Sequence, residues 1–284
     1  MKKVLFASTA LIAVAGVAAA EVSIGGAARL GIAYTEGAAD ETVIESRLRF
    51  NIDADASSDN GLQFGGRIRI QSDDGGAAVL NGARLDVSAG GFKVEVGNIG
   101  GAIDNMPNYY GYEPGLAAFT GQYAGLAAGY DGHSSTGAGR NGVNVGYKAN
   151  GFQGMISYSD TAGIERTAFM IGYDFGDYTA AIGYQDSNID ADDQLIVGTF
   201  GGSVGNFDFA IYLADEDAGT AWGVSGKFGV GAATDIVASI AGNDDDEFYG
   251  IGFVHDLGGG AAFAGGIGEN AGTQRGDLGM KFSF

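Results

Sequence analysis

The last nine residues of the chain, 276–284, read GDLGMKFSF. Apolar side chains stand at every second position of this stretch, at Leu278, Met280, Phe282 and Phe284. This period of two is typical of a β-strand with one apolar and one polar face. The last residues of a soluble domain usually fray, whereas this apolar face continues to the final residue. The pattern predicts a terminal strand that is covered on one side to its very end.

The composition of the whole chain narrows the classes of protein to consider. It has 284 residues, 53 of them Gly and none Cys, with 15 Lys and Arg against 35 Asp and Glu, a formal net charge of −20. Such acidity argues against nucleic acid as a partner. Hydrophobic residues make up 45% of the chain and follow an ordered alternation, which argues against disorder. The sequence therefore predicts a folded, disulfide-free protein.

The first residues have the organisation of an export signal. Lys2 and Lys3 precede an apolar run over residues 4–17, and Ala18 and Ala20 supply the small residues of a cleavage site before Glu21. A membrane anchor is the alternative, but the run is short and lacks a stop-transfer flank. We therefore predict a signal peptide at residues 1–20 and an exported domain at residues 21–284.

Short alternating segments follow one another along the rest of the chain. They cover residues 22–34, 44–52, 62–70, 83–89, 92–96, 143–147, 152–158, 167–173, 178–184, 195–203, 207–213, 222–228, 236–240, 248–254, 261–267 and 278–284. Each has the length and period of a strand. The sequence thus predicts an all-β protein of sixteen strands.

The connections between these segments alternate in kind. One set is short and rich in Gly, as at residues 89–91, 149–151, 176–177 and 205–206. The other set is longer and acidic, as at residues 36–41, 186–193, 214–219 and 242–247. Short turns at one end and longer loops at the other indicate an up-and-down antiparallel meander.

One stretch, residues 98–140, lacks sustained alternation and contains both prolines, Pro107 and Pro114. A loop of this length is usually functional or a sign of a wrong assignment. Treating residues 121–130 as a strand would give seventeen strands and would exchange the two kinds of connection from there on. An even strand number therefore favours one long loop, the third on its rim.

A sixteen-stranded meander needs a place for its apolar faces. The opposite faces carry many charged residues, so an apolar face that pointed inward would place those charges in lipid. It would also leave a barrel interior too large for these side chains to fill. Outward apolar faces and a closed sheet leave no unpaired strand edge in the hydrocarbon. Aromatic residues near strand ends fit interfacial girdles; they are Tyr34, Tyr158, Tyr173, Tyr178, Tyr184 and Phe284. We therefore predict a transmembrane β-barrel with a polar lumen.

Six arginines lie on the polar faces of neighbouring predicted strands: Arg29, Arg47, Arg49, Arg67, Arg69 and Arg84. An Arg on the lipid face costs roughly 2–4 kcal/mol at mid-bilayer, so all six should point into the lumen. They then form a basic wall that can set the charge selectivity of a pore. The alternative is a structural role, in which Glu45, Asp53 or Asp73 pairs with them to hold the wall together.

Several motifs of the chain resemble a known family. They are EVSIGGAARLGIAY (residues 21–34), SRLRFNI (46–52), FGGRIRIQSDDG (64–75), VGNI (96–99) and MKFSF (280–284). They are similar to the general-diffusion porins of Rhodobacter-type alphaproteobacteria. The resemblance implies a homotrimer in the outer membrane of a Gram-negative bacterium, in contact with lipopolysaccharide, and a terminal aromatic read by the insertion machinery.

The same resemblance implies that the third loop, residues 98–140, folds into the lumen and forms a constriction. It further implies that carboxylates of this loop face the arginines across the aperture. The loop offers Asp104, Glu113 and Asp131 for this role. Opposed charges in a narrow aperture orient dipolar solutes and disfavour bulky apolar ones.

The sequence offers little else with chemical function. His133 and His255 lack metal-ligand spacing, so we expect neither a catalytic site nor a bound cofactor. An acidic loop segment, Asp244, Asp245, Asp246 and Glu247, supplies oxygen ligands for a divalent cation such as Ca²⁺. The alternative is an acidic loop that is simply solvated, since the segment lacks EF-hand spacing.

The sequence as a whole predicts a channel for passive diffusion of small hydrophilic solutes and ions. Its net acidity favours cations at the mouths and the arginines oppose this inside, so we expect mild cation selectivity. Two alternatives remain open: a substrate-specific channel, with saturable flux, and a non-conducting barrel with a structural or adhesive role.

Overall fold

The computed structural model describes residues 20–189 and 194–284. The predicted signal peptide, residues 1–20, lies outside the described residues except for its last position. Over the described part of the chain, no helix is long and apolar enough to cross a membrane. The regular structure is instead one antiparallel sheet with strands β1 to β17.

The strands before the long loop are β1 (Glu21–Thr35), β2 (Thr42–Ser57), β3 (Gln63–Asp73), β4 (Val79–Leu80), β5 (Arg84–Ala89) and β6 (Phe92–Asn98). The strands after it are β7 (Asn141–Ala149), β8 (Phe152–Thr161), β9 (Ile164–Phe175), β10 (Tyr178–Ser187), β11 (Gln194–Val204), β12 (Phe207–Glu216), β13 (Gly219–Gly229), β14 (Thr234–Gly242), β15 (Glu247–Gly258), β16 (Ala261–Asn270) and β17 (Thr273–Ser283).

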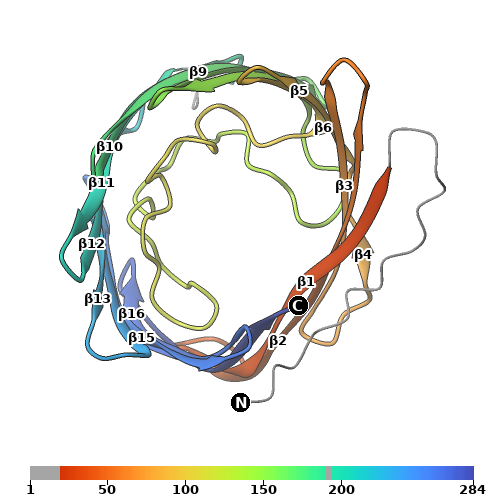
Figure 1. The fold of residues 1–284 in the computed structure, drawn as a ribbon. Helices are drawn as coiled ribbons and strands as arrows, with labels where there is room; N and C mark the ends of the chain where they lie inside the picture. Colours follow the sequence, from red (N-terminus) through yellow and green to blue (C-terminus); the bar gives the residue numbers. More distant parts are fainter. Residues whose placement is uncertain (1–19, 190–193) are drawn as a thin grey trace.

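The sheet closes into a barrel, because β1 pairs with β2 on one side and with β17 on the other (Figure 1). The short segments β4 and β5 both pair with β3 and together form one interrupted strand. The barrel wall therefore has sixteen antiparallel strands, as predicted. Each predicted segment corresponds to one of them.

The two rims differ less than the sequence suggested. Strands β12 and β13 continue to Glu216 and from Gly219, so most of the predicted acidic loop at residues 214–219 is strand. Backbone hydrogen bonds between neighbouring strands are independent of side-chain charge, so a hairpin can extend through acidic residues beyond its apolar part. Part of another predicted loop, residues 190–193, lies outside the described residues.

The apolar faces of the strands point outward. In β9, Phe169, Ile171 and Tyr173 are exposed, whereas the alternating Ala168 and Met170 are buried inside the barrel. Large exposed hydrophobic side chains occur in the same way on strands around the wall. A surface this apolar is unsuited to water and matches the hydrocarbon of a membrane.

Aromatic residues gather on this outer surface. Near the short turns, Phe175, Tyr178, Phe200 and Phe209 pack in series, with ring centroids 5.6–6.3 Å apart. Tyr34, Tyr158 and Tyr173, predicted for the girdles, are exposed on the outer face. Such rings suit the membrane–water interfaces.

The terminal Phe284 completes the seam between β17 and β1. Its carbonyl oxygen accepts a hydrogen bond from the amide of Gly26 at 2.8 Å, and its amide donates to the carbonyl of Gly26 at 3.1 Å. Its ring contacts the ring of Phe50 edge-on, with centroids 5.4 Å apart. A Cβ atom at Gly26 would lie 2.7 Å from the ring, so this position requires glycine. The final residue is thus part of the wall, as the opening pattern predicted.

We expect Phe284→Ala to slow assembly and to lower the thermal transition of the barrel. The change removes an aromatic pair, which contributes about 1 kcal/mol beyond buried area, at the position where the sheet closes. The measurement is the rate of appearance of the heat-modifiable folded band in lipid vesicles. Leu257→Ala is the matched control, because Leu257 is exposed near the same rim and lies outside the seam. Equal rates for the two variants would contradict a role of Phe284 in closure.

The long connection between β6 and β7, residues 99–140, does not extend over the rim but folds back inside the barrel (Figure 1). It runs along the inner surface of the second half of the wall, and it contacts the side of β1 to β3 mainly at Leu116, beside Gly31, and at its returning end, where Ser135 accepts a hydrogen bond from Arg69. The loop therefore divides the lumen into a filled part and an open part.

Candidate functional site

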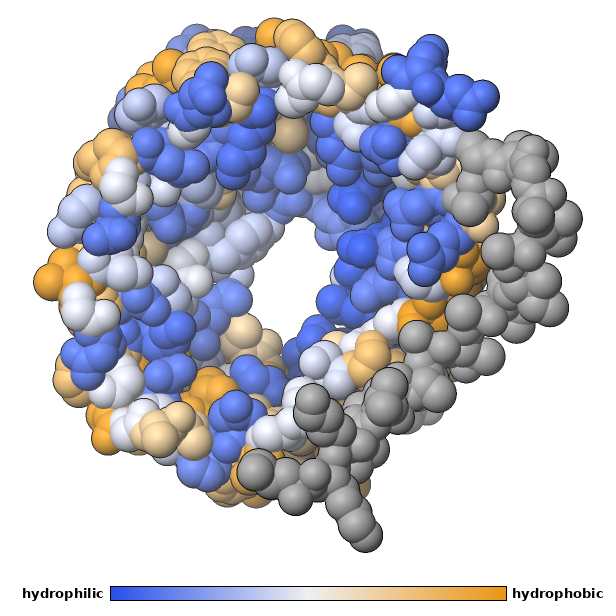
Figure 2. All heavy atoms as spheres, in the orientation of Figure 1, coloured by the Kyte–Doolittle hydropathy of each residue, from blue (hydrophilic) through white to orange (hydrophobic). Residues whose placement is uncertain are grey.

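An open passage runs along the barrel axis between the loop and the wall of β1 to β3. Figure 2 shows this opening at the centre of the molecule, bordered mostly by hydrophilic residues, whereas hydrophobic residues lie mainly at the outer edge. This passage and the two surfaces that border it form the candidate functional site.

Strand register brings the six predicted arginines together on the inner surface of β1, β2, β3 and β5. Arg29 lies directly opposite Arg47, and Arg67 lies directly opposite Arg84. Like charges in directly opposed positions destabilise a sheet. The wall must therefore compensate them.

Three of the arginines have a carboxylate partner. Arg29 Nε lies 2.5 Å from Glu45 Oε1, and Arg67 Nε lies 2.5 Å from Asp53 Oδ1. Arg84 Nε lies 3.6 Å from Glu95 Oε1, which Lys93 also contacts at 2.8 Å. Arg29 and Arg67 thus form close ion pairs, whereas Arg84 shares Glu95 with Lys93 and its Nε atom makes no hydrogen bond with the residues that the structure describes.

The other three arginines have no carboxylate partner among the described residues. Arg49 Nε donates to the amide oxygen of Gln71 at 2.6 Å. Arg69 donates to Asn51 at 2.8 Å and to the hydroxyl of Ser135 at 2.6 Å. Amides and hydroxyls satisfy the donors without cancelling the charge. The Nε atom of Arg47 is buried and has no hydrogen-bond partner.

The structure therefore divides the predicted basic wall into two groups. Arg29, Arg67 and Arg84 fit the structural alternative, in which carboxylates pair with them. Arg47, Arg49 and Arg69 keep a net positive charge facing the lumen. We call these three residues the unpaired arginines.

The loop packs against the opposite wall through a hydrophobic cluster inside the barrel. The loop contributes Ala102, Ile103, Met106, Tyr109 and Ala128 to this cluster. The wall contributes Ala168, Met170, Leu195, Val197, Tyr212, Ala214 and Ala221 from β9 to β13. Burial of this apolar area stabilises the loop in the lumen. The inner face of these strands is consequently partly apolar, a feature that the prediction of a polar lumen did not include.

Two carboxylates of the wall hold the loop by its backbone. Asp277 on β17 accepts hydrogen bonds from the amides of Leu116 and Ala117, each at 2.7 Å. Glu216 on β12 accepts hydrogen bonds from the amides of Ala127 and Ala128. Bonds to a charged acceptor are stronger than neutral ones. These two residues therefore tie the loop to two separate parts of the wall, β17 and β12.

Sequence reasoning missed both residues as site residues. The alternation in residues 276–284 puts Asp277 on the polar face of the last strand without indicating a partner, and Glu216 falls in the predicted acidic loop at residues 214–219. The signal in the sequence that could have identified them is an isolated acidic residue at a lumen-facing position, near the rim from which the loop starts. Its partner is a backbone amide, which has no sequence signature.

Two of the three predicted loop carboxylates, Asp104 and Glu113, lie beside tyrosines. Asp104 accepts a hydrogen bond from the hydroxyl of Tyr110, and Glu113 accepts one from the hydroxyl of Tyr123 at 2.7 Å. The rings of Tyr110 and Tyr123 meet edge-on, with centroids 5.1 Å apart. Burial raises the pKa of Asp104 and of Glu113, so each carboxylate loses its charge at a higher pH than a solvated one.

The third predicted carboxylate, Asp131, has a different position. Only 3% of its side chain is exposed, and it lies 3.3 Å from Arg140 and 3.4 Å from Arg166. It also accepts a hydrogen bond from Ser159 at 2.5 Å. Asp131 is thus an anchor between the loop and the β8–β9 wall and does not line the open passage. A buried carboxylate is stable only when it is paired, and Arg140 and Arg166 supply the partners of Asp131.

The returning end of the loop lies against the arginine wall. Burial and the nearby arginines, Arg69 and Arg84 foremost, lower the pKa of His133 to about 4. His133 is therefore neutral at pH 7. It adds no charge to the passage under ordinary conditions.

Metal binding receives no geometric support from the described residues, where no group of three or more His, Cys, Asp or Glu side chains is arranged to hold an ion. The predicted Ca²⁺ site at Asp244, Asp245, Asp246 and Glu247 lies in the β14–β15 turn. The amides of Asp245 and Asp246 donate to the Asn243 side chain. Calcium binding there stays a prediction.

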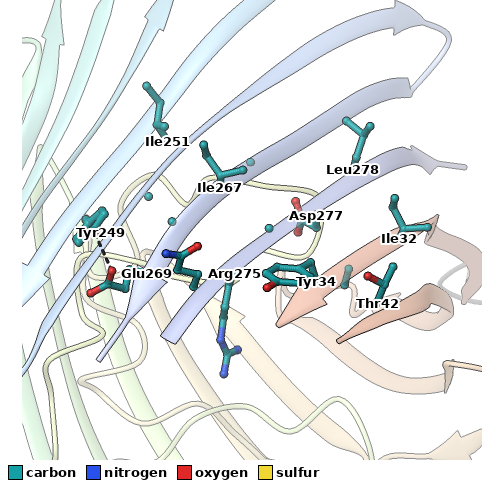
Figure 3. A pocket seen from close by; sticks show the side chains of 16 residues that line it. Ile32, Tyr34, Thr42, Tyr249, Ile251, Ile267, Glu269, Arg275, Asp277 and Leu278 are labelled. Atoms are coloured by element: carbon teal, nitrogen blue, oxygen red, sulfur yellow. Dashed lines mark hydrogen bonds between the residues drawn. The ribbon is translucent and has the colours of Figure 1, made fainter. Parts of the chain in front are cut away.

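A groove of about 730 Å³ lies on the outer surface, across β15, β16, β17 and β1. Figure 3 shows Ile251, Ile267 and Leu278 on one side of these strands and Arg275 on the other. The groove occupies the apolar side, which faces lipid. It is therefore not part of the central passage.

Comparison with known proteins agrees with this architecture. The chain matches the family described as Gram-negative porin over residues 7–274. It is 27% identical to the porin of Rhodobacter capsulatus, over 93% of this chain and 100% of that protein. It is 34% identical to the porin of Fuscovulum blasticum over 150 residues, which cover 49% of this chain and about half, 52%, of that relative.

Solved structures show the same fold at lower identity. A chain described under "Asymmetric conductivity of engineered proteins" aligns with a TM-score of 0.83 and 23% identity, over 93% of this chain and all of that one. A mutant of the Rh. blastica porin aligns with a TM-score of 0.82, 23% identity and the same coverage. Since the family match spans most of the sequence and the barrel has the same fold, this chain belongs to the Gram-negative porin family.

Proposed function

We propose that this porin forms a water-filled channel for passive diffusion of small hydrophilic solutes and ions across the outer membrane, without a catalytic cycle. The observation that carries the proposal is the open, hydrophilic passage beside a loop anchored inside the barrel (Figure 2). A barrel that served only as a scaffold or adhesin would not require this passage to stay open.

The loop, residues 98–140, and the unpaired arginines would form the constriction. Asp104 and Glu113 are the loop carboxylates proposed to act against Arg47, Arg49 and Arg69, and Asp131 holds the loop in place. A field between opposite charges in a narrow aperture orients dipolar solutes. The chain as a whole is strongly acidic, with a net charge of −20, so we propose mild cation selectivity.

Export through a signal peptide at residues 1–20, contact with lipopolysaccharide and assembly into a homotrimer belong to the same proposal. Two short strands in the wall favour a neighbouring copy at this position. Strands β5 and β6 have only six and seven residues, whereas a membrane-spanning strand needs about 9–11. A neighbouring copy beside these short strands would remove the mismatch with lipid.

The test is the conductance of the refolded full barrel in a planar bilayer under a salt gradient. Stepwise openings, in groups of three for a trimer, with a small cation-selective reversal potential support the proposal. A flux that saturates with one solute and is blocked by it favours a substrate-specific channel. A folded, heat-modifiable barrel that never conducts contradicts the channel.

We expect replacement of two unpaired arginines, Arg49→Gln with Arg69→Gln, to raise the cation-to-anion permeability ratio about two- to threefold, because two uncompensated positive charges leave the aperture. The measurement is the reversal potential under a salt gradient. Lys148→Gln with Lys227→Gln is the matched control, because it removes the same charge away from the arginine wall. A ratio that changes equally in both variants would show that only net charge matters.

A further inference from the structure

A row of three cations crosses the seam of the barrel. Lys281 on β17 lies directly opposite Arg29 on β1, and Arg29 lies directly opposite Arg47 on β2. All three are on the lumen side, since the neighbouring Leu30, Leu48 and Met280 are exposed on the outer surface. Three like charges in line across adjacent strands are unfavourable unless a negative charge is shared among them.

Of the described carboxylates close to this row, only one forms an ion pair with a member of it. Glu45 pairs with Arg29 at 2.5 Å. Both oxygens of Asp277 are occupied by the amides of the loop, and Asp73 accepts from Gln71 at 2.6 Å. Asp73, which lies directly opposite Arg47 in the β2–β3 register, and Asp277 keep their negative charges, but neither forms an ion pair with a member of the row.

Lys281 and Arg47 consequently have no ion-pair partner within the described residues. The Nε atom of Arg47 is moreover buried without any hydrogen-bond partner. Buried donors in folded proteins are nearly always satisfied, so an orphaned one points to a bound water or ion. Arg47 and Lys281 therefore lie at one site, where no described carboxylate is in contact with either of them.

The row borders a pocket of about 240 Å³ inside the lumen. Its charged lining residues are Arg29, Arg47 and Lys281, all three of them basic. Leu116, in the loop segment held by Asp277, lies at its edge. This volume accommodates a small ion with its hydration or a compact phosphomonoester.

We propose that this pocket binds a small tetrahedral oxyanion of the phosphate class. Two guanidinium groups and one ammonium group offer the planar and the rotatable donors that such an ion accepts. A bound oxyanion would satisfy Arg47 and share its charge with Lys281. The proposal adds a solute-binding site to the proposed channel: phosphate would be retained briefly during passage, whereas chloride would pass freely.

Binding of inorganic phosphate to the folded, detergent-solubilised barrel tests the site without relying on conduction. We expect saturable binding by isothermal titration calorimetry, and about tenfold weaker binding in Lys281→Gln, because one charge-assisted contact is lost. Arg47→Gln is the second variant, should the first fold poorly. Lys227→Gln is the matched control, because Lys227 pairs with Asp208 on another part of the wall. Absence of saturation, or an equal loss in the control, would overturn the proposal.

Conductance separates this site from the channel function. In wild-type channels, phosphate should reduce the chloride current in a saturable manner, and Lys281→Gln should abolish that reduction. A barrel that binds phosphate but never conducts would retain the site and refute the channel. A barrel that conducts but neither binds phosphate nor is slowed by it would refute the site alone.

Discussion

Removal of residues 103–129 should raise the single-channel conductance about threefold, because conductance increases with the width of the pore and the loop fills much of the lumen. The structure allows a clean deletion. The amide of Gly101 donates to the carbonyl of Asp131 at 2.6 Å, so the two ends of the loop are already side by side. A two-glycine linker between Ala102 and Tyr130 can join them. The anchor of Asp131 to Arg140 and Arg166 remains.

The deletion also exposes part of the hydrophobic cluster, including Met170, Leu195 and Tyr212, to water. We therefore expect a lower thermal transition together with the higher conductance. The heat-modifiable band and the β-sheet circular dichroism spectrum show whether the barrel still forms. A folded deletion variant with unchanged conductance would mean that the narrowest part of the channel lies elsewhere.

Release of the loop from the wall should have the second large effect. In Asp277→Ala with Glu216→Ala, four backbone amides of the loop lose a charged acceptor. A buried donor left without a partner costs about 1–3 kcal/mol, so the segments around Leu116 and Ala127 should detach from the wall. We expect a several-fold increase in the open-channel current noise and frequent partial closures, recorded in single-channel traces.

The matched control for this change is Asp86→Ala with Asp53→Ala. Both controls remove carboxylates of the wall that pair with side chains of the wall, Lys93 and Arg67, and not with the loop. The change in net charge is the same. Equal noise in the two double variants would refute the view that Asp277 and Glu216 restrain the loop.

The fold could be predicted from the sequence because a membrane barrel repeats one local rule along the whole chain. The alternation in residues 276–284 and in fifteen other segments fixes which side chains face lipid. A one-residue shift would reverse every face. The same rule placed Arg29, Arg47, Arg49, Arg67, Arg69 and Arg84 on the inner surface. The even strand number then identified residues 98–140 as a loop.

The partners of these charges could not be predicted in the same way. Asp131 and Asp104 have the same chemistry in the sequence, but one is buried against Arg166 and the other contacts Tyr110 near the passage. Glu45, Asp53 and Glu95 form ion pairs with three arginines, whereas within the described part of the chain Arg47, Arg49 and Arg69 form none. Such choices depend on strand register and on the path of the loop.

The strands, their faces and the closed wall follow from the amino-acid sequence alone, because each depends on local periodicity and on the cost of polar groups in lipid. The position of the loop, the carboxylates that hold it and the cations that lack an ion pair among the described residues are set by the folded barrel. These features depend on contacts between residues far apart in the chain, such as Asp277 with Leu116 and Lys281 with Arg29. Backbone amides and neighbours across a seam have no sequence signature, so the width and the charge of the passage arise only when the barrel closes.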